Sequence, residues 1–353
     1  MATLTEAAYH TRRAIKIVIF VLIGLIGLKI IQKTFNIAWK RLNPPRPPAP
    51  TVSFGKLPNL KFPENKDLPE SLNFRLETIE GKLPLFSNIL QVYFIPKNLY
   101  TYLTLERAQN RAKLLGFTNH PNQPFQEEKT IYQWEIKNFF PSSLTMDIIS
   151  QNFQFEYDYR RDQALLAAPA TLNNDQALVE LKRYLAKVGI LHNDLKKGTA
   201  NFTPYRYIGS QLVRADSISE TDFIKVNLFR EPIKKFEILP ANPYEANISA
   251  LVSKSDQRRI VQLDFAYFQI DQEVWATYPT KDTTQAWEEL KNGQGHIANL
   301  GDNETGEIVI RKVSLAYFDP PTYQPYLQPV FVFSGDHRFT AYVPAITDQW
   351  TQR

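Results

Sequence analysis

The 353-residue chain has no cysteine and only 13 glycines. The lack of cysteine excludes disulfides, thiolate nucleophiles, zinc fingers and cysteine-ligated iron–sulfur clusters. The sequence contains neither glycine-rich phosphate-binding signature, G-x-x-x-x-G-K-S/T or G-x-G-x-x-G, and no G-x-S-x-G turn of the kind that carries a catalytic serine. These absences leave no local motif for nucleotide binding or covalent catalysis.

Histidine is also scarce, and its five residues are too far apart in sequence to form an HxxH or HExxH pair. We expect each to be a solvated loop residue, although a metal site assembled from distant positions stays open. The five are His10, His120, His192, His296 and His337. Two adjacent acid pairs, Glu127-Glu128 and Glu288-Glu289, point in different directions on their elements and form no acid/base dyad. We therefore predict no catalytic residue, no cofactor and no metal.

The loop Gly301–Glu307 is acidic enough to suggest calcium. It lacks the D-x-D/N-x-D/N-G spacing that calcium loops use. We interpret it as a hairpin turn that precedes a strand.

Positive charge is concentrated at the N-terminus. The first fifty residues hold eight basic side chains and one acid, a net charge of +7, whereas the whole chain carries +5. Residues 51–353 therefore carry −2. A nucleic-acid-binding protein needs a basic face on its folded domain, so we expect no nucleic-acid partner.

One long apolar run occurs, from Ile17 to Leu28, and it contains no charge. Snorkelling lysines and further apolar residues extend it to Lys16–Phe35, which is roughly 30 Å of helix at about 1.5 Å per residue. This pattern predicts a single membrane span that stays attached, because no small-x-small cleavage site follows Leu28 closely. A cleaved signal peptide and a buried core helix are the alternatives. The lipid bilayer is the partner that we expect for this helix.

The charges on the two sides of the span do not agree with one simple orientation. Three basic residues precede it and five follow it, which favours a cytoplasmic body by the positive-inside rule. Long domains weaken that rule because they cross the membrane largely regardless of charge. Residues 43–50 contain five prolines and predict an extended stalk between the span and the body.

The body has the patterning of an α+β fold, because helical segments that end near a glycine are each followed by alternating strands. The predicted helices are Thr104–Leu115 with Thr104 as the cap, Asp175–Val188, and Thr284–Lys291 capped by Asp282 or Thr283. The predicted strands are 131–136, 144–149, 153–159, 204–213, 223–229, 259–269, 273–278, 307–317, 327–333 and 338–343. Without βαβ alternation, we expect antiparallel sheets with helices on one face. The helix–strand order recurs three times, which favours internal duplication.

This reading divides the chain into seven segments. They are a cytoplasmic N-terminus over 1–15, a transmembrane helix over 16–35, a proline-rich stalk over 36–70, a first α+β unit over 71–165, a middle helix–strand unit over 166–250, a C-terminal α+β unit over 251–346 and a tail over 347–353.

The unit that begins with the Glu106-x-Ala108-x-x-x-Ala112 pattern and continues past Gly116 resembles the PepSY domain. The C-terminal hairpin within 327–345 is similar to the closing hairpin of PepSY-like domains. A single span before such units is similar to membrane-anchored YycI/YycH-type regulators of histidine kinases. The resemblance implies an extracytoplasmic, non-catalytic regulatory or peptidase-inhibitory module, and it places the body outside the cytoplasmic membrane.

The loop Pro320–Tyr326 combines prolines with two tyrosines, Tyr323 and Tyr326. Tyrosine supplies contact area at low entropic cost, so we predict these two residues to be exposed and to bind a partner. A packed connection between strands is the alternative interpretation.

The sequence favours a membrane-anchored binding or regulatory protein that recognises an envelope protein or peptide. A component that binds wall or surface polymer is the second hypothesis, and an enzyme with a dispersed active site is the third. A histidine that shares a deep pocket with two carboxylates would favour the third.

Overall fold

The computed structural model describes residues 22, 24–25, 27–35, 49–64, 68–69, 71–122, 130–169, 171–303 and 306–352. The chain divides into two compact units, Met1–Ala49 and Pro50–Arg353. In the first unit the described residues from 22 to 35 are helical, and six large apolar side chains along them are exposed. They are Leu22, Leu25, Leu28, Ile30, Ile31 and Phe35.

Among the residues that the structure describes, no helix is both long enough and apolar enough to cross a membrane. The predicted span begins at Lys16, and its residues 16–21, 23 and 26 lie outside the described residues. The same holds for the predicted N-terminus over 1–15 and for residues 36–48 of the predicted stalk.

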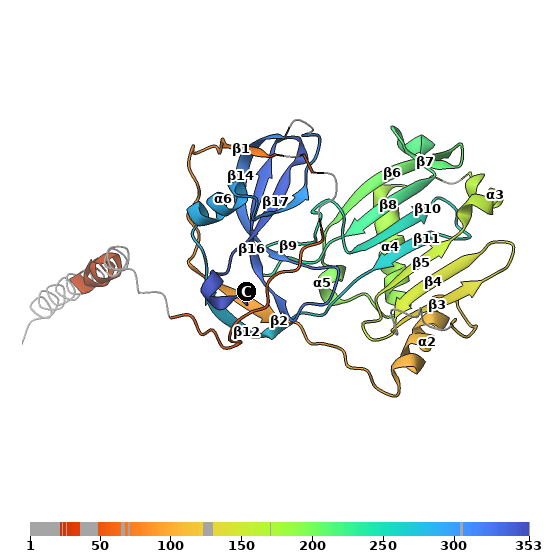
Figure 1. The fold of residues 1–353 in the computed structure, drawn as a ribbon, viewed down its shortest axis with the longest axis horizontal. Coiled ribbons are helices and arrows are strands. Elements are labelled where there is room, and N and C mark those ends of the chain that lie inside the picture. Colours follow the sequence, from red (N-terminus) through yellow and green to blue (C-terminus); the bar gives the residue numbers. More distant parts are fainter. Residues whose placement is uncertain are drawn as a thin grey trace, which may run out of the picture. The chain divides into compact units, whose positions relative to one another are not determined.

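The larger sheet of the second unit has the strand order β3-β4-β5-β11-β10-β8-β6-β7 (Figure 1). All of its pairings are antiparallel. The strands are β3 (Ile131–Ile136), β4 (Ser142–Asp147), β5 (Phe153–Tyr157), β6 (Ala200–Ile208), β7 (Gln211–Arg214), β8 (Phe223–Leu228), β10 (Ile248–Ser253) and β11 (Ile260–Phe265).

Period-two alternation gives the β4, β5 and β11 part of this sheet one apolar and one polar face, whereas nearly all residues of β8 and β10 are buried. In β5, Phe153, Phe155 and Tyr157 are buried, whereas Gln154 and Glu156 are exposed. Helices α2 (Thr104–Leu114) and α4 (Asn174–Lys187) cover the apolar face and share one hydrophobic cluster with it. The predicted arrangement of helices on one face is therefore confirmed for this sheet. Two short helices, α3 (Gln163–Leu166) and α5 (Asn193–Lys196), precede and follow α4 in the chain.

The starts of the two long helices differ from each other. Asn173 caps α4 in a capping box with Gln176. The prediction that Thr104 caps α2 is wrong, because Leu103 is the cap residue and Thr104 is the first helical residue. The Thr104 hydroxyl is instead buried and accepts a hydrogen bond from the amide of Thr101 at 2.7 Å.

The second sheet has the order β1-β14-β16-β17-β13, with β9 paired to β14. Its strands are β1 (Asn73–Leu76), β9 (Ile238–Leu239), β13 (His296–Asn299), β14 (Glu307–Phe318), β16 (Pro329–Gly335) and β17 (Thr340–Pro344). Phe331 and Phe333 of β16 pack toward α6 (Thr283–Lys291), and Val330 and Val332 pack toward a separate cluster. This sheet is therefore buried on both faces, which explains its nearly continuous apolar strands.

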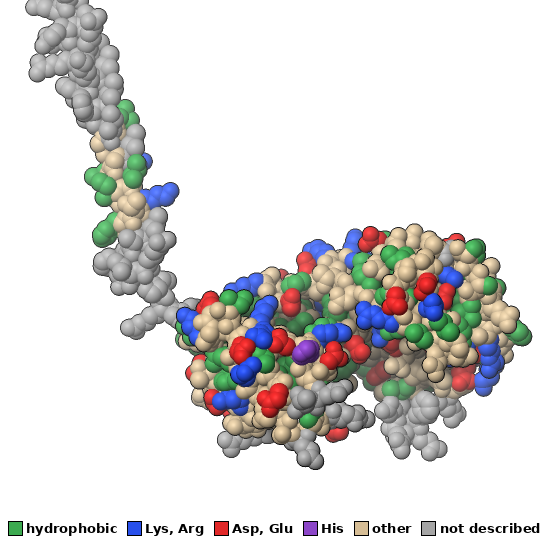
Figure 2. Space-filling view, turned by 90° about the horizontal axis from the view of Figure 1, so that it is seen from above, with side chains coloured by type: hydrophobic (Ala, Val, Ile, Leu, Met, Phe, Trp, Pro, Cys, Tyr) green, Lys and Arg blue, Asp and Glu red, His purple; other side chains and the backbone are tan. Residues whose placement is uncertain are grey.

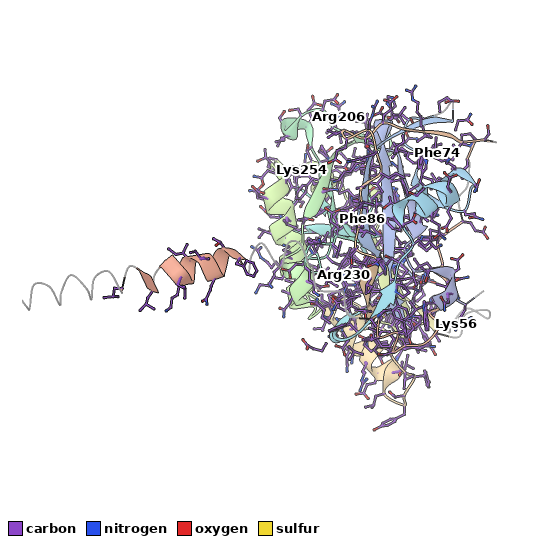
Figure 3. All side chains as sticks on the ribbon, turned by 90° about the vertical axis from the view of Figure 1, so that its left-hand side faces the viewer. Lys56, Phe74, Phe86, Arg206, Arg230 and Lys254 are labelled. Carbon is purple, nitrogen blue, oxygen red and sulfur yellow. The ribbon has the colours of Figure 1, made fainter. Side chains whose placement is uncertain are left out.

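A third, three-stranded sheet has the order β12-β2-β15. Its strands are β2 (Ile89–Phe94), β12 (Asp271–Pro279) and β15 (Tyr326–Leu327). Two phenylalanines that precede β2 in the chain, both labelled in Figure 3, pack around the second sheet. Phe74 of β1 contacts Trp287 of α6 and Phe339, and Phe86 contacts Phe331 of β16. Short 3-10 turns cover Tyr159–Arg161, Ile218–Glu220, Asp336–Arg338 and Asp348–Trp350.

The α+β class with mainly antiparallel sheets is confirmed. The exceptions are β1 and β9, which both pair with β14 in parallel. The strand orders that follow α2, α4 and α6 differ from one another, so the recurring helix–strand order does not produce one recurring sheet topology.

The sheets also cross the segment boundaries that we drew at residues 165 and 250. Strand β5 of the first segment pairs with β11 of the third, and β1 and β2 of the first segment pair with C-terminal strands. Part of the predicted stalk belongs to the body as well. Leu57 is fully buried in a cluster with Val92 and Tyr278 of the third sheet. Phe62 stacks on His296 and packs on one face of the second sheet.

Candidate functional site

A cavity of about 880 Å³ lies at one end of the eight-stranded sheet. Its walls are α2, the turn between β4 and β5, the residues that follow β11, and the two segments 96–99 and 321–323. We call it the α2 cavity. Its volume lies within the range of about 300–1,000 Å³ that is usual for ligand pockets.

Two arginines of α2 line this cavity, one helical turn apart. Arg111 is half-buried, and its Nη1 and Nη2 atoms donate to the Val188 carbonyl at 3.2 Å and to Gln151 Oε1 at 3.0 Å. Arg107 is exposed. Within the described part of the chain, neither guanidinium lies within ion-pair distance of a carboxylate. Burial lowers the pKa of Arg111, as expected for a cation with only neutral partners.

The turn from Asp147 to Asn152 holds Gln151 against Arg111. Asp147 Oδ1 accepts hydrogen bonds from the amides of Ile149 and Ser150, and Gln151 has a φ of 61°. A left-handed conformation is uncommon for a residue other than glycine and is often found at functional positions. Asn152 then ties the turn to the next wall, because its Oδ1 accepts from the amide of Tyr267 at 3.0 Å.

A row of hydrogen-bonding side chains crosses the polar face of the same sheet, and we call it the polar row. It consists of Gln133, Thr145, Gln154, Asp264, Ser249, Asn227 and Asn201, in the order of strand pairing. Thr145, Gln154 and Asp264 line the α2 cavity. The polar face of the sheet therefore forms part of its wall.

Asp264 is the half-buried carboxylate of the polar row. It accepts long hydrogen bonds from Ser249 Oγ at 3.3 Å and Gln262 Nε2 at 3.5 Å. No lysine or arginine among the described residues lies within ion-pair distance of it. Burial raises the pKa of Asp264, and these hydrogen bonds and the charge of Lys225 oppose that shift only in part.

Behind the cavity lies a buried group of charges, which we call the Arg230 cluster: Arg230, Asp194, Asp319 and Tyr267. The Arg230 Nε donates to Asp194 Oδ2 at 2.7 Å, and its Nη1 donates to Asp319 Oδ1 at 3.2 Å. Its guanidinium lies 4.5 Å from the Tyr267 ring centroid, and the Tyr267 hydroxyl donates to Asp194. Tyr267 also lines the cavity. The cluster therefore links the Tyr267 wall of the cavity to Asp319, the residue that follows β14.

The histidines do not all occupy solvated loops. His120 and His337 are exposed, as expected, and His10 lies outside the described residues. The prediction is wrong for His296, which lies in β13, is 8% exposed and stacks on Phe62. His192 is half-buried, lines the cavity and stacks on Tyr267 with ring centroids 4.2 Å apart. Burial lowers the pKa of both His192 and His296.

His192 shares the cavity with two carboxylates, Asp147 and Asp264. Its ring makes no hydrogen bond to a carboxylate in the described part of the chain, and no group of three metal-binding side chains occurs there. Of the acid pairs, Glu127-Glu128 lies outside the described residues. Glu288 and Glu289 contact different lysines, Lys291 and Lys281. The cavity thus contains the residue types that would favour an enzyme, but among the described residues no hydrogen bond joins the His192 ring to either carboxylate.

The two predicted partner-binding tyrosines occupy different environments. Tyr323 is half-buried, lines the cavity and donates its hydroxyl to the Ile95 carbonyl. Tyr326 lies in β15 and stacks on Phe54 at 4.8 Å, away from the cavity lining. The loop between them is less exposed than we expected, because Gln324 is 3% exposed and donates to the Lys61 carbonyl.

The sequence analysis missed Arg107, Arg111 and Asp264. The arginines are four residues apart on one helix face, and this pattern was visible without a structure. Asp264 interrupts the apolar alternation of β11, but its position in the cavity depends on the strand pairing.

Comparison with known proteins does not assign the chain to a family. No family model matches the chain, and no curated protein matches its sequence. Among solved structures, an uncharacterized protein from Eubacterium rectale ATCC 33656 is similar over 81% of this chain and 91% of its own, with 11% identity and a TM-score of 0.35.

Proposed function

We propose that the chain is a membrane-anchored binding or regulatory protein without catalytic activity, whose body recognises a protein or peptide partner in the α2 cavity. The observation that carries this proposal is the cavity itself, which is large and lined by half-buried charges that have no ion-pair partner in the described body. Such charges are costly unless a ligand compensates them.

The proposed membrane anchor is the segment 16–35. It is supported by the uncharged run from Ile17 to Leu28 and by the exposed apolar side chains of its described helical residues. The basic flanks suit an anionic membrane surface. We propose that the body is extracytoplasmic, as in the YycI/YycH-type regulators that the sequence resembles. Helix α2 followed by the antiparallel strands β3, β4 and β5 supports the proposed likeness to a PepSY unit.

The cysteine-free sequence allows a direct test of this orientation. We expect Val179→Cys, on the exposed face of α4, to react with a membrane-impermeant maleimide in intact cells, because the body lies outside. The N-terminal control Ala2→Cys should react only after the membrane is permeabilised. The opposite pattern would show that the body is cytoplasmic.

The cavity is tested by filling it from two sides. Gln154→Trp on β5 and Thr322→Trp on the facing segment each place an indole in the cavity, and both positions are exposed. We expect each variant to bind peptides selected on the wild-type protein at least about tenfold more weakly, which is about 1.4 kcal/mol. The measurement is fluorescence anisotropy with peptides from a random display library and the full-length chain in detergent.

The matched control for these variants is Val179→Trp, which adds the same side chain to an exposed helix outside the cavity. It should bind the selected peptides as the wild type does. Unchanged binding by both cavity variants would place the peptide site elsewhere, and a library from which no peptide is enriched would contradict peptide recognition altogether.

The exposed and half-buried members of the polar row on β3, β4, β5 and β11 favour the second candidate function, binding of wall or surface polymer, because their amide, hydroxyl and carboxylate groups suit a polymer rich in hydroxyl groups. Ser249 and Asn227 of the same row are buried. Retention of the full chain on purified wall material, lost in Gln154→Trp, would distinguish this function from peptide binding. Basic and acidic side chains are interspersed on the face in Figure 2, which supports a partner other than nucleic acid.

A further inference from the structure

We infer that the ligand of the α2 cavity is an extended peptide with both a carboxylate and a cationic group, the carboxylate bound by Arg111 and Arg107 and the cation bound by Asp264. This inference rests on the proposed function and gives the chemistry of its ligand. It follows from two half-buried charges of opposite sign that line one cavity without ion-pair partners in the described body.

The arginine end suits a carboxylate. A guanidinium has five N–H donors, and the two hydrogen bonds of Arg111, which lines the cavity, do not use all of them. Arg107 adds a second guanidinium one turn away on the same helix. Planar, bidentate binding of a carboxylate is the interaction that arginine makes best, and it would compensate the half-buried charge of Arg111.

The acidic end suits an ammonium or guanidinium group. The contacts of Asp264 at 3.3 and 3.5 Å come from neutral side chains and are long, so the carboxylate is free to accept stronger bonds. Burial already raises the pKa of Asp264, and a cation from the ligand would lower it again. Thr145 and Gln154 lie beside it in the polar row and offer hydrogen bonds to peptide groups.

The position of the two ends favours an extended ligand. Arg111 belongs to the helix that covers the apolar face of the sheet, whereas Asp264 lies on the opposite face, between Leu263 and Phe265 of the core. A ligand that reaches both must pass the turn Asp147–Asn152. An extended peptide can span that turn along the cavity lining.

The charge of the cavity also favours a ligand with both signs. Its lining contains Lys97, Arg107 and Arg111 against Asp147 and Asp264, a net charge of +1. A polyanion would meet both carboxylates, and a polycation would meet three positive groups. A dipolar peptide meets opposite charges at both ends.

The test is a random-peptide display selection on the full-length chain in detergent, carried out in parallel on wild type, Arg111→Gln and Asp264→Asn. Peptides enriched on the wild type should carry one acidic and one basic group at a constant separation. Selection on Arg111→Gln should lose the preference for the acidic group, and selection on Asp264→Asn should lose the preference for the basic group. Wild-type peptides should bind each variant at least about tenfold more weakly.

The matched controls are Arg183→Gln on α4 and Glu156→Gln on the same sheet face, and both should keep the wild-type selection. If Arg111→Gln does not fold, the exposed Arg107→Gln provides the same test with a smaller loss. Enriched peptides without paired charges, or a charge preference that both variants retain, would overturn the dipolar ligand and leave peptide recognition intact. A selection with no enrichment over Gln154→Trp would overturn the proposed function and, with it, this inference.

Discussion

Replacing Arg230 with methionine is expected to lower the free energy of unfolding by about 3–5 kcal/mol. Arg230, labelled in Figure 3, is 6% exposed. It forms ion pairs with both Asp194 and Asp319. Methionine fills similar space but leaves two largely buried carboxylates without a cation. Removing one partner of a buried ionic group costs far more than the group contributes as a whole, because the remaining charges have lost their hydration without compensation.

Urea unfolding of the full-length chain, followed by tryptophan fluorescence, measures this loss. The control Arg183→Met removes an exposed arginine from α4, where an i,i+3 pair with Glu180 is worth about 0.5 kcal/mol or less. Adding Asp319→Asn to Arg230→Met should recover part of the stability, because one of the two uncompensated charges is then gone. A loss below about 1 kcal/mol in the single variant would show that water reaches the cluster.

The loss should also depend on pH. Burial raises the pKa of Asp319, and the charge of Arg230 opposes that shift, so Arg230→Met raises the pKa of this carboxyl further. The folded variant then binds a proton that the unfolded chain releases at a lower pH, and stability falls as pH rises through the folded-state pKa. The difference between variant and wild type should therefore be larger at pH 8 than at pH 5.

Local sequence patterns predicted the three long helices of the body and many of its strands, because such patterns depend on near neighbours. The strands β1, β2, β9, β10 and β13 were not predicted, and the predicted strand 204–213 is a hairpin of the two strands β6 and β7. The helix that we expected over 175–188 is Asn174–Lys187, and Gly189 follows it with a φ of 75°. The alternation of β5 predicted which side chains would be buried. Such patterns consist of the hydrophobic period of an element and of the residues at its ends. Both are determined by residues that are close together in the sequence.

The pairing of strands could not be predicted in the same way. Alternation in β5 shows that one face is buried, but nothing in it identifies β11, more than a hundred residues later, as the neighbouring strand. For this reason the sequence did not show that strands pair across the boundaries drawn at 165 and 250. The α2 cavity depends on the same pairings, since Asp264 reaches its wall only when β11 lies beside β5. The register between β5 and β11 cannot be predicted from the local patterns of a single sequence.

The loop Gly301–Glu307 shows how a long-range contact can constrain a turn that the sequence marks only as acidic. Gly301 has a φ of 64°, and a Cβ added there would lie 1.8 Å from the His337 carbonyl oxygen. The amide of Asp302 donates to the same oxygen at 3.2 Å, and Asn303 Nδ2 donates to the Asp336 carbonyl at 3.3 Å. The backbone at 301 therefore packs directly against the turn between β16 and β17.

Gly301→Ala is expected to lower the free energy of unfolding by about 2–5 kcal/mol, because it adds the cost of a left-handed alanine to that of overpacking against a backbone carbonyl. The matched control is Gly209→Ala, whose φ is 58° and whose added Cβ has no neighbour within 4 Å. It should lose only the conformational cost of about 1–2 kcal/mol. Urea unfolding of both variants measures the difference. Equal losses would mean that the His337 carbonyl moves aside freely, whereas a larger loss at 301 would show that the two turns are rigidly packed.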